Sequence, residues 1–124
     1  MSSFFISKGE RMYYTYIIRC EDNTLYTGMA KDLEARMLEH YHRTEKCAKY
    51  TMRHHMKKLE MAWTSADRSL ASKLEYNIKH LSKSQKEDLL INFDLKKYLE
   101  DKIDVKEYSK ISASEVKKIA KMLK

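Results

Sequence analysis

The 124-residue sequence predicts an α/β (α+β) fold, in which a small, largely antiparallel three-stranded sheet is flanked by helices and followed by a helical C-terminal extension. Three features predict this fold. Residues 13–28 have the composition of a β-hairpin, residues 59–64 alternate in character, and the segments after them carry apolar residues at helical spacing. Because two strands alone are marginally stable in water, the third strand is needed for a stable sheet.

The hairpin runs from Tyr13 to Gly28. Both arms are rich in β-branched and aromatic residues, and the polar residues 21–24 between them predict a short loop. Since successive side chains of a strand point to opposite faces, Tyr14 and Tyr16 share one face. A lone glycine at the end of a strand implies a conformation or a close approach that a side chain would forbid, which singles out Gly28.

The first helix is predicted to follow the hairpin directly. Asp32 is a suitable N-cap, and apolar residues recur at helical spacing to about His42. Arg36 and His40 are four residues apart on this helix, so they lie one turn apart on the same face, beside the apolar stripe.

A basic connection and a third strand come next. Residues 43–58 show no sustained period, which predicts an irregular segment crossing the surface. Leu59–Thr64 alternates, and we expect Leu59, Met61 and Trp63 to form one buried face of a strand.

Two further helices are predicted after this strand. Asp67 is the expected N-cap of a long helix with a continuous apolar stripe. Glu75 lies at the edge of that stripe, a position from which a carboxylate can point into a cleft. Ser82 and Gln85 have the spacing of a capping box, so a short helix through about Ile91 follows.

The composition then shifts toward Lys, Asp and Glu. We expect residues 93–103 to form one amphipathic helix, and Ser112 with Glu115 to cap another. The chain is therefore divided into a domain of residues 1–91 and a helical extension of residues 92–124.

Composition limits the class of protein. An apolar content of 43% suffices for a compact core, and the net charge of +7 favours a polyanionic partner, although a solvated helical surface is also rich in charge. No apolar run is long enough to cross a bilayer, and the start lacks the order of a signal peptide, so a cytoplasmic location without membrane attachment is expected. Residues 1–11 have no clear period and are expected to form an irregular start. Cys20 and Cys47 form no CxxC pair and are interpreted as small core residues.

Four segments together carry a resemblance to a known family. They are YTYIIRC, LYTGMAKDLEARMLEH, AKYT and DRSLASKLEYNIKHLS. From Tyr13 to about Leu90 the sequence resembles the GIY-YIG nuclease superfamily, and more narrowly its small single-domain group, long labelled uncharacterised. Tyr14 stands where the first signature triplet usually has glycine, as is common in this group.

The resemblance implies a divalent-metal-dependent endonuclease. The matching tyrosines, Tyr16 and Tyr26, would line the active site, and one of them would help to deprotonate the attacking water. Arg36 would stabilise the phosphorane, and His40 would support the site or shuttle a proton. Glu75 would be the single glutamate that binds Mg²⁺ (or Mn²⁺).

Each of these residue types suits its implied task. A phenol has a pKa near 10, so it needs a perturbing neighbour to act as a base near neutrality. A guanidinium offers several donors to a charged phosphorane, and Mg²⁺ is commonly held by one carboxylate with water and phosphate oxygens. Taken alone, the same residues would be interpreted as half-buried strand tyrosines, an exposed arginine, a surface histidine and a solvated glutamate.

A nucleic-acid-binding surface is expected beside this site. Its candidates are Tyr14, Gly28, Lys49, Tyr50 and Arg53, and the basic side chains with one stacking aromatic suit contact with phosphates. A solvated basic loop is the alternative. DNA is favoured over RNA as the substrate.

Two other functions stay open. One is a non-catalytic nucleic-acid-binding module on the same fold, and the other is a protein-interaction adaptor that acts through the C-terminal extension. No obligate protein partner is evident from the sequence.

Overall fold

The computed structural model describes residues 12–123, so the irregular start expected for residues 1–11 lies outside the described residues. The elements are β1 Tyr13–Cys20, β2 Leu25–Ala30, α2 Leu33–Tyr41, α3 Lys49–Arg53, β3 Met56–Ser65, α4 Arg68–Lys79, α5 Lys83–Asn92, α6 Lys96–Leu99, the 3₁₀-helix η2 Val105–Glu107, β4 Ser109–Lys110 and α7 Ala113–Met122.

The sheet has four strands in the order β2-β1-β3-β4, and every neighbouring pair is antiparallel. The predicted fold class is confirmed, but the predicted number of three strands is one too few. The added strand, β4, pairs Ser109 and Lys110 with Thr64 and Trp63 of β3. Two residues are too short to show alternation, so the sequence pattern gave no sign of this strand.

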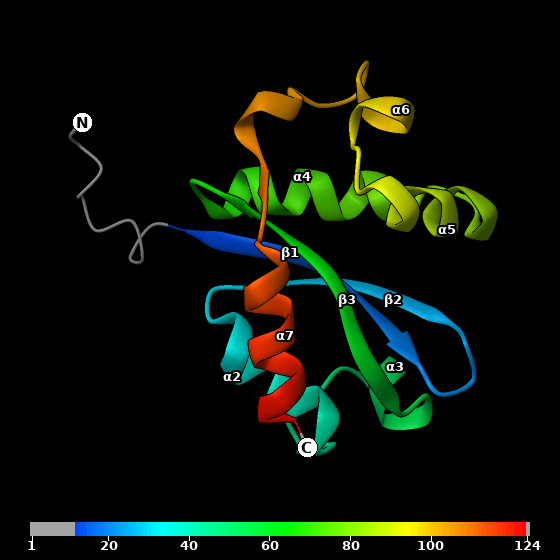
Figure 1. Ribbon diagram of the computed structural model, residues 1–124, viewed down its shortest axis with the longest axis vertical. Coiled ribbons are helices and arrows are strands. Elements are labelled where there is room, and N and C mark those ends of the chain that lie inside the picture. The colour runs from blue at the N-terminus through cyan, green and yellow to red at the C-terminus, as the bar shows by residue number, and fades with distance from the viewer. Residues whose placement is uncertain (1–11, 124) are drawn as a thin grey trace.

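Helices cover both faces of the sheet (Figure 1). α4 lies along one face, where the hydroxyl of Thr15 donates to the carbonyl of Ala71 at 3.0 Å. α2 lies on the other face, where Tyr16 contacts His40. β1 is consequently a central strand with both faces buried, and the predicted alternation along it decides which side chain meets which helix.

β3 differs from its prediction in length and register. It begins at Met56 rather than Leu59, and a register shift occurs between the partners of Ile17 and Ile18. Leu59 pairs with Ile18, whereas Met61 pairs with Ile17, so Leu59 and Met61 lie on opposite faces instead of one.

The irregularity in β3 brings Glu60 to Arg19. Arg19 Nε donates to Glu60 at 2.7 Å, and the same guanidinium binds both carboxylate oxygens of Glu87 on α5 at 2.6 and 2.8 Å. This charged cluster ties the hairpin to β3 and α5.

Helix starts agree with the sequence. Asp32 accepts from the Ala35 amide at 3.1 Å, Asp67 caps α4, and Ser82 forms a complete capping box with Gln85. These caps confirm the predicted beginnings of α2, α4 and α5.

The connection over residues 43–58 is not wholly irregular, because it contains α3 and the start of β3. The five residues of α3 complete little more than one turn, which is too short for a period to be recognised. α3 carries Lys49, Tyr50 and Thr51, so it matters for the site described below.

The C-terminal extension packs on the same sheet as the rest of the chain. The single helix predicted for residues 93–103 is wrong, because Phe93 ends α5 with a left-handed backbone (φ 56°) and only α6 follows. α7 is confirmed, with Ser112 as its N-cap, and it places Ile119 in the core. The domain boundary between residues 91 and 92 stays a prediction.

Cys20 is buried and Cys47 is partly buried, and both are free thiols. Within residues 12–123, every helix is too short or too polar to cross a membrane.

Candidate active site

Four residues from three elements meet on the α2 face of the sheet. Tyr16 comes from β1, Tyr26 from β2, and Arg36 and His40 from α2. The centroids of the Tyr16, Tyr26 and His40 rings lie 5.6 to 6.4 Å apart. Residues that are 4 to 24 positions apart in the sequence are thereby brought into one cluster.

Tyr16 and His40 form the buried floor of this cluster. The Tyr16 hydroxyl lies 2.7 Å from His40 Nε2, and the two side chains are 1% and 0% exposed. His40 Nδ1 lies 2.7 Å from the hydroxyl of Thr51 on α3. The histidine is therefore satisfied at both ring nitrogens, as a buried polar side chain should be.

Burial sets the proton affinity of both groups. It lowers the pKa of His40 to about 4, with the neighbouring charge of Arg36 acting in the same direction, so His40 is neutral at pH 7. Burial also raises the pKa of Tyr16, and the hydrogen bond from Arg36 offsets this only in part. The free protein therefore holds a phenol at Tyr16, not a phenolate.

The low pKa of His40 predicts a loss of stability in acid. Between pH 6.5 and 4 the unfolded chain binds a proton at His40 that the folded protein does not, so the free energy of unfolding falls as the pH falls through this window. We expect this histidine to account for about 3 kcal/mol of the loss between pH 7 and pH 4.

Urea unfolding at several pH values measures this effect. A His40→Gln variant should lose less stability than the wild type over the same window, because the titrating group is gone. Parallel pH curves for the two proteins would contradict the low pKa.

Arg36 is held at the rim of the cluster. Its Nε lies 3.4 Å from the Tyr16 hydroxyl, while one terminal nitrogen donates to Glu39 at 2.7 Å and to the Lys46 carbonyl at 2.6 Å. The side chain is 24% exposed. It is thus fixed in position and still partly accessible, unlike the freely exposed arginine that its helix position alone would suggest.

Gly28 makes room for Tyr16. A Cβ atom at Gly28 would lie 2.6 Å from the Tyr16 hydroxyl oxygen and 3.0 Å from the ring of Tyr26. The φ angle of Gly28 is not positive, so close approach and not backbone conformation explains the glycine. This is one of the two reasons that the sequence suggested.

Gly28→Ala is expected to move the Tyr16 hydroxyl away from His40 and Arg36. The methyl group would lie inside the contact distance of the buried Tyr16 ring, whose hydroxyl already contacts His40 and Arg36, so we expect the cleavage activity that the family resemblance implies to fall about tenfold or more while the fold persists. Activity and thermal unfolding measured together would test this. An active variant with wild-type stability would show that the close approach is unimportant.

Glu75 reaches the cluster from the other side of the sheet. It lies on α4, next to the edge strand β2, and its charge contributes to the raised pKa of Tyr16. Lys79 Nζ lies 3.2 Å from the Glu75 carboxylate and 5.8 Å from the centroid of the Tyr26 ring. The side chain of Glu75 is 21% exposed, so its carboxylate is partly accessible.

Aromatic rings extend the cluster toward α3. Tyr26 stacks on Tyr50 with centroids 5.4 Å apart, and Tyr50 stacks on His54 at 4.2 Å. His54 is anchored by Asp22 of the hairpin loop. Tyr50 is therefore next to the site, as the resemblance implied.

The basic candidates on α3 are exposed. In the part of the chain that the structure describes, neither Lys49 nor Arg53 belongs to an ion pair. They flank Tyr50 in the sequence on the same short helix. Both are available to a polyanion that approaches the aromatic rings.

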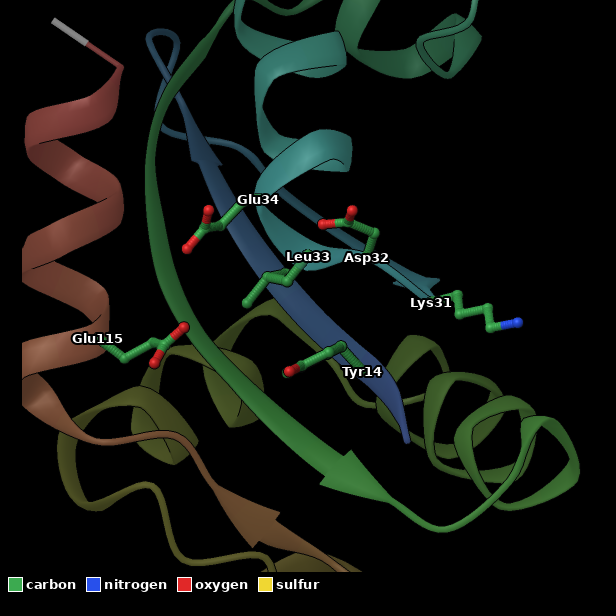
Figure 2. A pocket seen from close by; sticks show the side chains of 6 residues that line it. All are labelled: Tyr14, Lys31, Asp32, Leu33, Glu34 and Glu115. Atoms are coloured by element: carbon green, nitrogen blue, oxygen red, sulfur yellow. The ribbon is translucent and has the colours of Figure 1, made fainter. Parts of the chain in front are cut away.

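Tyr14 lies apart from the other candidates. It lines a pocket with Asp32, Glu34 and Glu115, and Figure 2 shows Tyr14 and Glu115 pointing toward each other across it. Burial raises the pKa of Tyr14, and these three carboxylates raise it further. Acidic surroundings disfavour a phosphate, so the position of Tyr14 gives no support to its predicted role.

Three neighbours of the site were missed from the sequence, namely Thr51, Lys79 and His54. Thr51 belongs to the AKYT segment, but no spacing in the sequence links it to His40. Lys79 follows Glu75 by four residues, which is a recognisable helical ion-pair spacing. His54 becomes significant only when α3 stacks it on Tyr50.

Comparisons of the sequence with known proteins find related chains. A family model described as the GIY-YIG catalytic domain matches residues 12–88. A UPF0213 protein of Fusobacterium nucleatum is 44% identical over 78 residues, which are 63% of this chain and 76% of the relative. The UPF0213 protein YhbQ of Salmonella typhimurium is also 44% identical, with the same coverage.

A solved relative also belongs to this group. The solution NMR structure of a UPF0213 protein from Bacillus halodurans is 35% identical, with a TM-score of 0.43, and covers 65% of this chain and 84% of that one. The match over residues 12–88 shows that the chain belongs to the GIY-YIG catalytic domain family, which is associated with endonuclease activity, and to its small UPF0213 group.

Proposed function

We propose that this protein is a divalent-metal-dependent endonuclease that hydrolyses phosphodiester bonds of nucleic acid, with DNA favoured over RNA. One observation carries the proposal. The hydroxyl of Tyr16 lies between a neutral, buried His40 and the guanidinium of Arg36, while Glu75 on α4 is near enough for its charge to raise the pKa of the same tyrosine. A binding protein would not need a proton acceptor and a fixed cation on one buried phenol.

The proton path follows from the contacts of Tyr16. A water molecule attacks phosphorus, the bond from phosphorus to the leaving oxygen breaks, and the leaving oxygen takes a proton from solvent. The attacking water gives its proton to the Tyr16 oxygen, while the phenolic proton passes to His40 Nε2. Because the pKa of Tyr16 is raised, a free phenolate would be costly to form. No phenolate forms if the tyrosine oxygen gains the proton of water at the same time as it loses its own proton to His40. Tyr26 is the second tyrosine of the site and the alternative group for receiving the proton of water.

Arg36 stabilises the charge that develops on the phosphorane oxygens. Its contacts with Glu39 and Lys46 hold the guanidinium in place before the substrate arrives, so little reorganisation is needed during the reaction. A lysine would offer a single point charge without the planar set of donors.

Glu75 would hold Mg²⁺ or Mn²⁺. Its carboxylate is partly exposed and already forms an ion pair with Lys79. It also provides the hard oxygen ligand that these ions prefer. Among residues 12–123, no three His, Cys, Asp or Glu side chains gather at one point, so water and substrate oxygens would complete the coordination. When bound, the ion would supply positive charge for the leaving oxygen.

Lys49, Tyr50 and Arg53 of α3 would contact the nucleic acid outside the reacting phosphate. The two cations would neutralise phosphates, and a base could stack near Tyr50 and His54. These contacts carry no sequence information, so weak sequence preference is expected.

A substrate panel tests the proposal. Labelled single-stranded, duplex and branched DNA and the matching RNAs are incubated with pure protein and Mg²⁺, and in parallel with EDTA. Metal-dependent cleavage of any substrate supports the proposed enzyme. Salt-sensitive binding of the same substrates without cleavage would favour the non-catalytic binding module instead.

The adaptor function can be tested separately. β4 and α7 cover β3, and Ile119 of α7 is fully buried, so removal of the extension would expose the core. Substitutions on the exposed side of α7, such as Lys117→Glu, test partner binding without that damage.

A further inference from the structure

We infer that Thr51 is a positioning residue that fixes the tautomer of His40, so that Nε2 is free to accept the proton of Tyr16. The inference rests on the proposed function for its catalytic meaning. Its structural content, the position of one hydrogen on His40, stands without it.

The hydroxyl of Thr51 takes part in two hydrogen bonds. Its oxygen is 2.7 Å from His40 Nδ1, and it is 3.2 Å from the Ala48 carbonyl oxygen one turn back. Thr51 is 0% exposed, as is His40, so water does not compete for either contact.

The direction of these bonds follows from what each group can do. A carbonyl only accepts, so the Thr51 hydroxyl donates its single hydrogen to Ala48. The contact with His40 then requires Thr51 to accept, and Nδ1 must carry the hydrogen. Since His40 is neutral, Nε2 has none and accepts from the Tyr16 hydroxyl.

Arg36 completes the chain at its other end. Its Nε donates to the oxygen of Tyr16, which leaves the phenolic hydrogen directed to His40. A single row of donors and acceptors thus runs from Arg36 through Tyr16, His40 and Thr51 to Ala48. Reversal of any bond would leave two hydrogens or two lone pairs facing each other.

A purely structural explanation is that Thr51 only satisfies a buried histidine. That explanation needs a partner at Nδ1, but it is indifferent to which nitrogen bears the hydrogen. The proposed proton transfer does require one tautomer, because a neutral His40 with its hydrogen on Nε2 cannot take a proton from Tyr16.

The tautomer can be measured directly. A long-range proton–nitrogen NMR spectrum of uniformly ¹⁵N-labelled protein distinguishes the protonated ring nitrogen of His40 from the unprotonated one. We expect hydrogen on Nδ1 in the wild type and in Thr51→Ser, and hydrogen on Nε2, or a mixture, in Thr51→Val. Hydrogen on Nε2 in the wild type, or an unchanged tautomer in Thr51→Val, would overturn the inference.

Cleavage rates give the second readout. Thr51→Val should lower kcat about tenfold to a hundredfold, the scale on which outer hydrogen-bond partners tune a histidine, and Thr51→Ser should restore most of it. Thr27→Val is a matched control, because it removes a buried threonine hydroxyl that has no hydrogen-bond partner among the described residues. Thr27→Val should cleave like the wild type.

The two readouts separate the failure of this inference from the failure of the proposed function. If the wild-type protein cleaves no substrate but has its hydrogen on Nδ1 of His40, the proposed nuclease function is wrong and the structural role of Thr51 stands. If the wild-type protein is active and Thr51→Val does not change its cleavage rate, the positioning role of Thr51 is wrong and the proposed nuclease function stands.

Discussion

Arg36→Ala is expected to lower the rate of phosphodiester cleavage about 100- to 1000-fold, the effect of removing one preorganised donor from a developing charge. The guanidinium contacts Tyr16 and is held by Glu39 and the Lys46 carbonyl, so it is in position before a substrate binds. Single-turnover cleavage at saturating protein measures the chemical step without the contribution of binding.

Two variants separate the role of the guanidinium from that of its charge. Arg36→Lys keeps the charge and loses the planar donors, so it should recover little of the rate. Glu39→Gln removes the ion pair and keeps the guanidinium, so its loss should be smaller than that of Arg36→Ala. A fully active Arg36→Lys would show that only charge matters at this position.

Tyr16→Phe is expected to lower kcat about 100-fold or more, which is the scale of a general acid–base contribution. The substitution keeps the ring among its buried neighbours and removes the oxygen that joins Arg36 to His40. A stability loss of about 1 kcal/mol is also expected, because His40 Nε2 is left without a partner.

Tyr26→Phe is the matched comparison for Tyr16→Phe. Tyr26 is less buried, and within residues 12–123 its hydroxyl makes no hydrogen bond, so its loss should hardly affect stability. We still expect reduced turnover, since Tyr26 faces the same site. If Tyr16→Phe cleaves at the wild-type rate and only Tyr26→Phe is slower, the group that accepts the proton of water is Tyr26 and not Tyr16.

Helix starts were predictable because capping is local. Asp32, Asp67 and Ser82 each stand next to the turn whose amide they satisfy, so a few residues of sequence contain the whole interaction. The hairpin was predictable for the same reason, since its alternation and its loop occupy one continuous stretch.

Short elements and unusual backbones were not predictable. α3 and β4 are too short to show a period. The left-handed cap at Phe93 carries no signal, because glycine or asparagine usually takes that conformation. The resulting early end of α5 explains why the expected helix over residues 93–103 does not form.

The identities of the site residues came from the resemblance, while their partners came only from packing. Glu75 lies on α4, which covers the face of the sheet opposite α2, and only the folded structure shows that its charge helps to raise the pKa of Tyr16. Likewise, nothing in the sequence relates Thr51 to His40 until α3 folds against α2.

Parallel cleavage assays of the wild type, Glu75→Gln and Arg36→Ala, purified identically and tested with Mg²⁺ on the same labelled DNA, are the most direct test of the nuclease site. We predict metal-dependent cleavage by the wild type and a loss of at least 100-fold in both variants, with all three proteins folded. Equal cleavage by all three would point to a contaminating nuclease and contradict the assignment of this site.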